Sequence, residues 1–306
     1  MPSIQSPLGA LPSRFRRERL LIVGCGDVGL RVNRILPSPV RVMALTSSAQ
    51  RVDLLRAQNI TPLRGNLDDP ATLQRLAGIA TRVLHLAPPP AEGWVDHRTL
   101  ALGRALRKRT RPVALVYGST SGVYGDCAGA WVDETRVVCP DSPRARRRQH
   151  AEDSVRFLGR SASIRSSILR IPGIYAPDRE GGTPRVRLTK RTPVLLPEDD
   201  VYTNHIHAED LARACARALW RGKPQRVYNV NDDTVLKMGD YFDLAADLYG
   251  LARPPRVSRD SARDQLPLML LSFMGESRRM VNHRLKRELG LRLRYPTVRE
   301  GLASLP

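Results

Sequence analysis

The chain has 306 residues, 42% of them hydrophobic and 5% aromatic, which is enough to bury the core of one large domain or of a domain with a smaller lobe. Its apolar runs are far shorter than the roughly 20 residues that span a bilayer, and its start lacks the order of a signal peptide, so we expect a disordered leader at 1–18 and a cytoplasmic protein. The net charge of +20 favours anionic ligands, but the basic residues are spread along the chain and no nucleic-acid-binding motif accompanies them, so specific nucleic-acid binding is the minor alternative.

From residue 19 onward, apolar stretches of strand length alternate with amphipathic stretches of helical length. This alternation predicts parallel βαβ units in an open, doubly wound sheet, the Rossmann form of the α/β class. Strands so continuously apolar are expected where helices cover both faces of a sheet. We expect strands at 19–24, 40–46, 60–66, 81–87, 112–120, 166–175 and 226–231, and helices at 27–36, 49–58, 68–78, 96–109, 142–153 and 208–220.

The chain divides into two parts by the regularity of this pattern. We expect a dinucleotide-binding Rossmann core at 19–160. After residue 160 proline-rich loops and short helices interrupt the alternation, so 161–306 is expected to return strands to the sheet and to add a smaller C-terminal lobe that binds the substrate.

Metal binding and disulfides are not indicated. The four cysteines lie far apart, with no CxxC pair and no Cys/His cluster, so we expect reduced and mostly buried thiols. The pair His205 and His207 has no third ligand nearby in the sequence, which argues against a metal site.

A glycine motif follows the first strand and opens the first helix. In Gly24-x-Gly26-x-x-Gly29, the first glycine permits a tight turn, the second lets the backbone approach a pyrophosphate, and the third lets the helix pack on the strand. Free N–H groups at the helix start, from Asp27 and Val28, attract phosphate. A carboxylate inside the loop would repel phosphate, so we expect Asp27 to face away or to cap the helix. A glycine-rich turn without a ligand is the alternative.

The end of the second strand decides the choice of cofactor. A site for NAD usually has an acidic residue about 20 residues after the glycines, where it holds the ribose 2′-hydroxyl. Here the segment from Thr46 and Ser47 to Arg51 has no acid before Asp53. Hydroxyls and an arginine suit a 2′-phosphate, which favours NADP(H) over NAD(H), although Arg51 also fits a solvated helix residue.

Five segments, in the right order, resemble an atypical branch of the extended short-chain dehydrogenase/reductases, the NAD-dependent epimerase/dehydratase group. They are YGSTSGVYGD at 117–126, LRIPGIYAPDR at 169–179, NHIHAEDLARA at 204–214, YNVNDD at 228–233 and a C-terminal segment at 277–302. The resemblance runs through most of the chain from residue 20 and implies the Rossmann fold predicted above.

The resemblance also implies site residues. Thr120 takes the position of the catalytic Ser/Thr, and Ser119 and Ser121 are neighbours able to substitute for it. The positions that would line the cofactor are Asn66 and Leu67 beside the adenine, Ala87 and Pro88 at the ribose, and Ile171 to Ile174 at the nicotinamide. Asn204, His205 and His207 would lie at the rim of the substrate pocket, although helix capping explains His207 better than catalysis.

The family's Tyr-x-x-x-Lys pair is missing. Its tyrosine exchanges a proton with the substrate, and its lysine lowers the tyrosine's pKa and binds the ribose. Ser142 and Pro143 form a credible helix start, and in that register Arg144 takes the place of the tyrosine and Arg148 that of the lysine. Arg148 retains a cation for the ribose, but a guanidinium neither gives nor takes a proton at neutral pH.

Three interpretations of this replacement remain open. In the first, the protein is an oxidoreductase in which Tyr124, Tyr175, Asp126 or a bound water acts as the acid, while Arg144 orients an anionic substrate. In the second, it binds NADP(H) without turnover, as a sensor or interaction protein. In the third, it is an epimerase-like enzyme whose hydride step needs no strong proton relay. We favour the first.

The substrate is a small molecule that the sequence does not name. Its pocket is expected from 175–205 and 255–280, and four basic residues within 185–191 suit a phosphate or carboxylate, although a flexible solvated loop explains them equally. The sequence is compatible with a monomer or a homodimer.

Overall fold

The structure is a computed structural model that describes residues 18–304, and it confirms the predicted α/β fold around a seven-stranded parallel sheet. The strands of this sheet are β1 (Arg19–Val23), β2 (Arg41–Thr46), β3 (Thr61–Arg64), β4 (Arg82–His85), β5 (Ala114–Thr120), β7 (Arg165–Ile171) and β12 (Arg226–Asn229). They lie in the order β12-β7-β5-β4-β1-β2-β3, and each neighbouring pair is parallel. The strand order reverses between β1 and β4, the point where doubly wound sheets bind their ligands.

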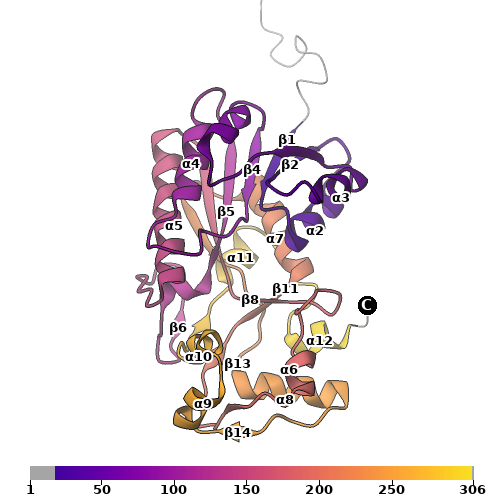
Figure 1. Cartoon of the computed structure of the whole chain (residues 1–306), viewed down its shortest axis with the longest axis vertical. Helices are drawn as coiled ribbons and strands as arrows, with labels where there is room; N and C mark the ends of the chain where they lie inside the picture. The colour runs from indigo at the N-terminus through magenta and orange to yellow at the C-terminus, as the bar shows by residue number, and fades with distance from the viewer. Residues whose placement is uncertain (1–17, 305–306) are drawn as a thin grey trace, which may run out of the picture.

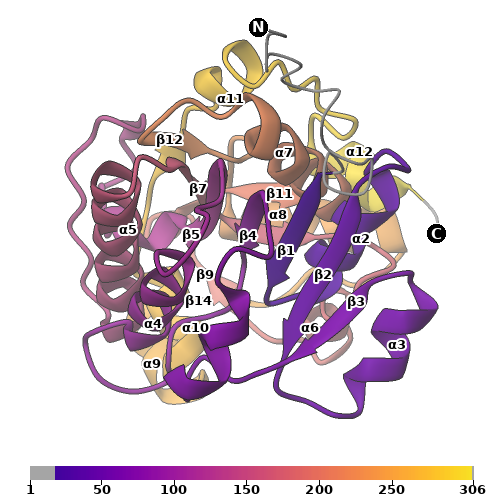
Figure 2. The same cartoon turned by 90° about the horizontal axis from the view of Figure 1, so that it is seen from above.

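Helices cover both faces of this sheet, as Figure 2 shows. The helices that cover it are α2 (Asp27–Ile35), α3 (Arg51–Ala57), α4 (His97–Leu106), α5 (Pro143–Ser161) and α7 (Ala208–Arg221). Alternate residues of β1 point to opposite faces: Leu20 and Ile22 share a core with α2 and α7, whereas Leu21 and Val23 share one with α4 and α5. The continuous apolar run of β1 is therefore explained by burial on both sides.

The remaining elements are mostly short, and most of them gather at the carboxyl ends of the strands, in the lower part of Figure 1. Tyr241 and Phe242 belong to a separate small core among them. The elements are η2 (Ser121–Tyr124), β6 (Trp131–Val132), β8 (Gly173–Tyr175), α6 (Arg185–Thr189), β9 (Val194–Leu195), β10 (Tyr202–Thr203), β11 (His205–His207), β13 (Leu236–Lys237), α8 (Met238–Tyr249), β14 (Arg256–Val257), α9 (Arg259–Gln265), α10 (Leu268–Met274), β15 (Arg279–Met280), α11 (His283–Arg287) and α12 (Val298–Ala303).

Two predicted elements differ from the structure. The helix expected at 68–78 is a 3₁₀ helix, η1 (Pro70–Leu76), with Asp69 as its N-cap. Its buried Leu73 and Leu76 are three residues apart, the spacing that a 3₁₀ helix aligns on one side.

The strand expected at 166–175 is also wrong as one element. β7 ends at Ile171, and after Pro172 the chain forms β8, which leaves the main sheet and pairs with β11. Pro172 has no N–H to donate, which suits the break between the two strands.

The leader expected at 1–18 lies outside the described residues except for Glu18. Within residues 18–304, no helix is long and apolar enough to cross a membrane. In the same part of the chain, no group of three or more His, Cys, Asp or Glu side chains is placed to hold a metal ion, and Cys139 is the exposed one of four free cysteines.

Candidate functional site

Three glycines shape the turn from β1 into α2. Gly24 has φ +85°, and a Cβ atom there would stand 2.3 Å from the backbone nitrogen of Ala87. A Cβ at Gly29 would stand 3.2 Å from Sγ of Cys25, whereas one at Gly26 would meet nothing within 4 Å. Gly24 thus serves backbone packing, Gly29 serves helix–strand packing, and Gly26 leaves space open, as the motif predicts.

The open space at Gly26 belongs to a cavity of about 800 Å³ against the N-terminus of α2, which we call the joining cavity. Gly26 is the N-cap of α2, and no side chain caps this helix end. Among the described residues, the first N–H groups of the helix, at Asp27 and Val28, therefore have no side-chain cap, and groups of this kind can bind an anion. The residues present fit the pyrophosphate of a dinucleotide.

A second cavity of about 560 Å³ lies at the ends of β2 and β3 and shares Gly24 and Gly26 with the joining cavity. We call it the adenosine-side cavity. The predicted cofactor residues that line it are Thr46, Ser47, Arg51, Asn66, Leu67, Ala87 and Pro88.

Two arginines in the adenosine-side cavity differ in their partners. Nη2 of Arg51 donates to the carbonyl oxygen of Cys25 at 2.6 Å, which holds Arg51 beside the glycine turn. Asp68 is the one carboxylate among the described residues that line this cavity, and Arg98 binds it through both oxygens at 2.7 and 2.6 Å. Arg51 therefore has no carboxylate partner here, which suits a ligand phosphate.

Asp27 neither faces away from the cavity nor caps α2, contrary to the expectation. It lines the joining cavity, and its Oδ1 accepts a hydrogen bond from Nε of Arg31 at 2.9 Å. Arg31 is buried and also binds Asp178 at 2.8 Å and Glu209. Burial opposes the charge of Arg31, but the hydrogen bonds to the three carboxylates outweigh it and raise its pKa. The loop tolerates Asp27 because Arg31 neutralises it.

The end of β5 places three hydroxyls differently. Thr120 lines both the joining cavity and a larger third cavity of about 930 Å³, the substrate cavity, and its Oγ1 accepts a hydrogen bond from N of Gly122 at 3.3 Å. Ser121 lines only the substrate cavity of the two. Ser119 lines only the joining cavity of the two, and its buried hydroxyl donates to Oε1 of Glu152 at 2.7 Å.

Arg144 and Arg148 of α5 have different partners. Arg144 lines both the joining and the substrate cavities, and its guanidinium lies 5.1 Å from the ring centre of Phe273 on α10. Partial desolvation of its guanidinium and the neighbouring charge of Arg148 lower the pKa of Arg144, although the residue as a whole is exposed. Arg148 lines the joining cavity, but its Nη1 donates to Oη of Tyr117 at 3.1 Å and to the oxygen of Gly118 at 2.8 Å. Part of its hydrogen-bonding capacity, expected to serve the ribose, is used by β5.

The side chains expected to act as acids lie in unsuitable places. The Tyr124 hydroxyl is buried and donates to Oδ1 of Asn229 at 2.7 Å, so its position contradicts a role as proton donor in the cleft. Asp126 accepts hydrogen bonds from N of Ala128 and of Ser277 and lines none of the three cavities. Tyr175 lines the substrate cavity, but its hydroxyl donates to the oxygen of Thr297 at 3.2 Å.

The residues expected at the rim of the substrate pocket also differ in their positions and partners. Asn204 lines the substrate cavity, yet its amide bonds the oxygen of Arg278 at 3.0 Å and N of Met280 at 2.8 Å. His205 lines the same cavity, stacks on Tyr241 at 4.2 Å between ring centres, and is held neutral because burial lowers its pKa to about 3. His207 caps α7 through Nδ1 and does not line the cavity, so capping is its structural role.

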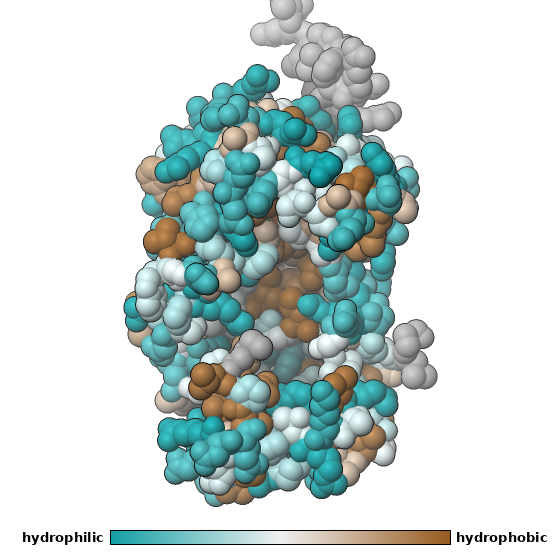
Figure 3. All heavy atoms as spheres, viewed as in Figure 1, coloured by the Kyte–Doolittle hydropathy of each residue, from teal (hydrophilic) through white to brown (hydrophobic). Residues whose placement is uncertain are grey.

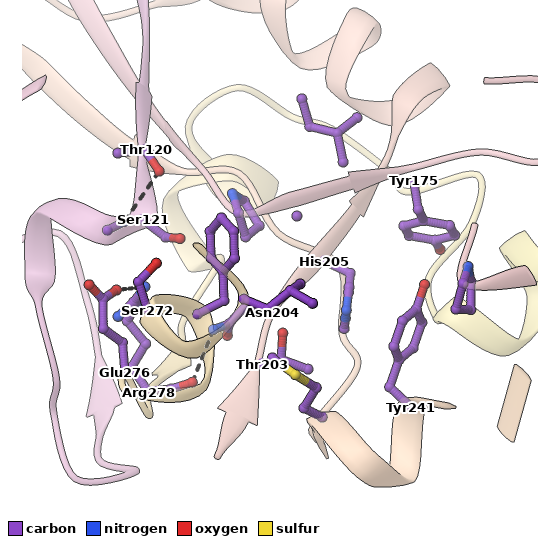
Figure 4. A pocket seen from close by; sticks show the side chains of 18 of the residues that line it. Thr120, Ser121, Tyr175, Thr203, Asn204, His205, Tyr241, Ser272, Glu276 and Arg278 are labelled. Carbon is purple, nitrogen blue, oxygen red and sulfur yellow. Dashed lines mark hydrogen bonds and ion pairs between the residues drawn. The ribbon is translucent and has the colours of Figure 1, made fainter. Parts of the chain in front are cut away.

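Figure 3 shows the hollow between the sheet and the smaller elements, with hydrophobic residues on its inner wall, and Figure 4 shows the side chains of one pocket in it. The predicted ranges 175–205 and 255–280 contribute much of the substrate cavity. Sequence reasoning missed Met238, Tyr241 and Phe242, because α8 carries no recognisable signal.

Arg187 of α6 is a guanidinium of the substrate cavity that has no carboxylate partner among the described residues. Its Nε and Nη2 atoms are buried without a hydrogen bond, and its guanidinium lies 4.2 Å from the ring centre of Phe242. Burial lowers its pKa. An unpaired cation in this cavity favours an anionic ligand.

Comparison with known proteins supports the fold described above. The family model described as NAD dependent epimerase/dehydratase family matches residues 21–231. Among curated proteins, no match is found. The structure of a functionally unknown conserved protein from Silicibacter pomeroyi is 33% identical, with a TM-score of 0.80 over 93% of this chain and 96% of that chain.

Two enzymes of known activity share the fold at lower identity. UDP-glucose 4-epimerase from Thermotoga maritima, solved with UDP-glucose, is 18% identical with a TM-score of 0.76 over 93% of this chain and 96% of its own. UDP-glucuronic acid 4-epimerase from Bacillus cereus, solved with NAD, is also 18% identical, with a TM-score of 0.72 over 93% and 96% of the two chains.

Proposed function

Because the chain belongs to the NAD dependent epimerase/dehydratase family, we propose that it is a nicotinamide-dependent oxidoreductase or epimerase-like enzyme that acts on a small anionic substrate. The observation that carries this proposal is that Thr120 and Arg144 line both the joining cavity and the substrate cavity. A substrate group held between these two side chains lies at the boundary between the glycine turn and the substrate side.

The cofactor proposed is NADP(H) in preference to NAD(H), and its nicotinamide supplies hydride exchange when bound. The first turn of α2 would hold the pyrophosphate, and Thr46, Ser47 and Arg51 would hold the 2′-phosphate. Support comes from Arg51, which stands beside the glycine turn without a carboxylate partner, and from Asp68, whose charge Arg98 already occupies. Arg148 would keep a cation near the ribose.

Arg51→Ala tests the choice of cofactor. The variant should lose affinity for NADPH by about tenfold and keep its affinity for NADH, because only the 2′-phosphate contacts this guanidinium. Fluorescence titration with both nucleotides measures the two dissociation constants. An equal loss for both nucleotides, or no loss for either, refutes the preference.

In this mechanism Thr120 donates or accepts a hydrogen bond at the substrate carbonyl or alcohol, and Arg144 holds the anionic substrate against it. Arg144 keeps its charge at neutral pH and does not relay the proton. Three of the acids considered from the sequence form hydrogen bonds with other parts of the protein. They are Tyr124, Asp126 and Tyr175. We therefore assign the proton exchange to a water bound beside Thr120.

Thr120→Val tests this assignment, with Ser121→Ala as the matched control on the same turn. A panel of anionic carbonyl compounds and nucleotide sugars, followed by NADPH oxidation, first identifies a substrate. Thr120→Val should then lower kcat by about tenfold or more, because it removes the hydroxyl without changing the side chain's shape. Ser121→Ala should keep most of the activity. An unchanged kcat in Thr120→Val removes Thr120 from the mechanism.

A second candidate function is NADP(H) binding without turnover, and the replacement of the usual tyrosine by Arg144 favours it. In that case NADPH binds and its fluorescence changes, but no compound in the panel oxidises it. Detection of one compound in the panel that oxidises NADPH, and is itself reduced, excludes this second candidate.

A further inference from the structure

The loop at 176–184, between β8 and α6, reaches across the cleft to the glycine turn. Its Asp178 accepts a hydrogen bond from Nη2 of Arg31 at 2.8 Å, which anchors the loop to α2. The next residue, Arg179, lines both the joining cavity and the substrate cavity. One loop from the substrate side thus places a cation at the N-terminus of the helix that would hold the cofactor.

The ion pair between Arg179 and Asp27 is incomplete. Nη1 of Arg179 stands 3.7 Å from Oδ2 of Asp27, which is too long for a hydrogen bond. Both atoms are buried, and neither has a hydrogen-bond partner within residues 18–304. Buried polar atoms of this kind are rare and call for a missing partner.

Asp27 does not need Arg179 for neutralisation, because its other oxygen already binds Arg31 at 2.9 Å. Arg179 has no shorter ion pair than this one among residues 18–304. Its guanidinium is therefore available to a further anion in the joining cavity, the cavity to which α2 presents its uncapped N–H groups.

We propose that Arg179 is a ligand of the cofactor pyrophosphate, and that this contact makes the position of loop 176–184 depend on whether the cofactor is bound. The proposal rests on the proposed function, since it requires a bound dinucleotide. With the cofactor absent, Arg179 remains near Asp27. With it bound, the guanidinium donates to phosphate oxygens, and the loop is held at both Asp178 and Arg179.

The test is nucleotide binding by Arg179→Gln, with Arg185→Gln as the matched control. Arg185 is exposed six residues further along and contacts the ring of Tyr249, so its variant removes the same charge away from both cavities. Fluorescence titration should show that Arg179→Gln binds NADPH about tenfold more weakly than the wild type, whereas Arg185→Gln binds normally. Circular dichroism confirms that both variants are folded.

A second readout follows the loop itself. Hydrogen exchange at 176–184 should slow when NADPH binds to the wild type, and this protection should be lost in Arg179→Gln. Equal affinity of Arg179→Gln and the wild type for NADPH overturns the proposal and leaves Arg179 as a ligand for the substrate anion. Failure of the wild type to bind any dinucleotide contradicts the proposed function instead, so the two failures are distinguishable.

The variant Asp27→Asn distinguishes two roles of Arg179: direct contact with the cofactor phosphate, and neutralisation of the charge of Asp27. If Arg179 binds phosphate directly, Arg179→Gln weakens NADPH binding by a similar factor in the wild-type and Asp27→Asn backgrounds. If Arg179 only offsets the charge of Asp27, its effect disappears in the Asp27→Asn background, and the assignment of Arg179 as a pyrophosphate ligand is overturned.

Discussion

Arg170, which is buried, and Arg187, which is half-buried, each lie beside an aromatic ring but differ in their carboxylate partners. Arg170 in the sheet is 4.6 Å from the ring centre of Tyr124, and Arg187 in the substrate cavity is 4.2 Å from that of Phe242. Arg170 binds both oxygens of the buried Glu152, at 3.1 and 2.8 Å, whereas Arg187 has no carboxylate partner among the described residues.

The comparison of these two guanidiniums shows which arginines of a strongly basic chain are available to bind a ligand. Burial opposes the charge of Arg170, but Glu152 outweighs burial and raises its pKa, while burial alone lowers the pKa of Arg187. The protein uses Arg170 to hold its sheet together. The charge available to a ligand belongs to arginines such as Arg187, so net charge by itself says little about binding.

The largest expected effect is on the paired cation. Glu152→Leu leaves Arg170 buried without its partner and should lower the free energy of unfolding by roughly 3–5 kcal/mol. Urea denaturation measures this loss. The double variant Glu152→Leu with Arg170→Met should recover most of it, because no buried charge then remains. A single variant as stable as the wild type removes the distinction between the two arginines.

The comparison extends to carboxylates, because Asp232 is buried without a salt bridge to any described residue. Burial raises its pKa to about 7. Between about pH 4 and 7 the folded state keeps a proton that the unfolded state has lost, so stability falls as pH rises through this window. Asp232→Asn cannot ionise and should gain stability relative to the wild type by roughly 1 kcal/mol per pH unit there.

Thermal or urea unfolding of both proteins from pH 4 to 8 measures this difference. Taking the difference between variant and wild type cancels the titration of His85 and His205, whose pKa values burial lowers to about 4 and about 3. A difference that does not change with pH contradicts the assignment to Asp232.

The variant Arg187→Met tests the same comparison at the arginine that has no carboxylate partner. Because no carboxylate loses a partner, unfolding should require at least as much denaturant as in the wild type, while KM for the anionic substrate should rise about tenfold. Denaturation and steady-state kinetics on one preparation give both values. A clear loss of stability would show that Arg187 has a structural role like that of Arg170.

The smallest effect is expected at Arg144, which is exposed and stacks on Phe273. Arg144→Gln should raise KM about threefold to fivefold, because water screens part of its attraction for the substrate. Arg146→Gln is the matched control, since Arg146 contacts Trp94 and lines none of the three cavities. Equal changes in the two variants would attribute the effect to bulk charge.

The sequence predicted what depends on local pattern. The apolar strands and the turn at Gly24 are determined by residues adjacent in the sequence, so the sequence predicted both the sheet and the glycine turn. Thr120 was predicted from the family resemblance of the segment YGSTSGVYGD, and the structure places it at the end of β5. The break at Pro172 was missed because Ile174 and Tyr175 continue the apolar pattern of β7 after the strand has ended.

Contacts between distant segments account for what sequence reasoning missed. Glu152 meets Arg170 and Ser119 only after α5 packs on the sheet. Arg31 binds Asp27 within α2 at i,i+4 spacing, which sequence reasoning could have noticed, and it also binds Asp178 and Glu209 from distant segments. No local spacing reports such partners.

The change of pairing at Pro172 has a consequence for how this protein can diversify. Up to Ile171 the chain is an interior strand, with β5 on one side and β12 on the other. From Gly173 it pairs only with the short β11. The segment that continues to α6 can therefore be rebuilt around a new substrate without disturbing the sheet, so stability and specificity can change separately in descendants of this chain.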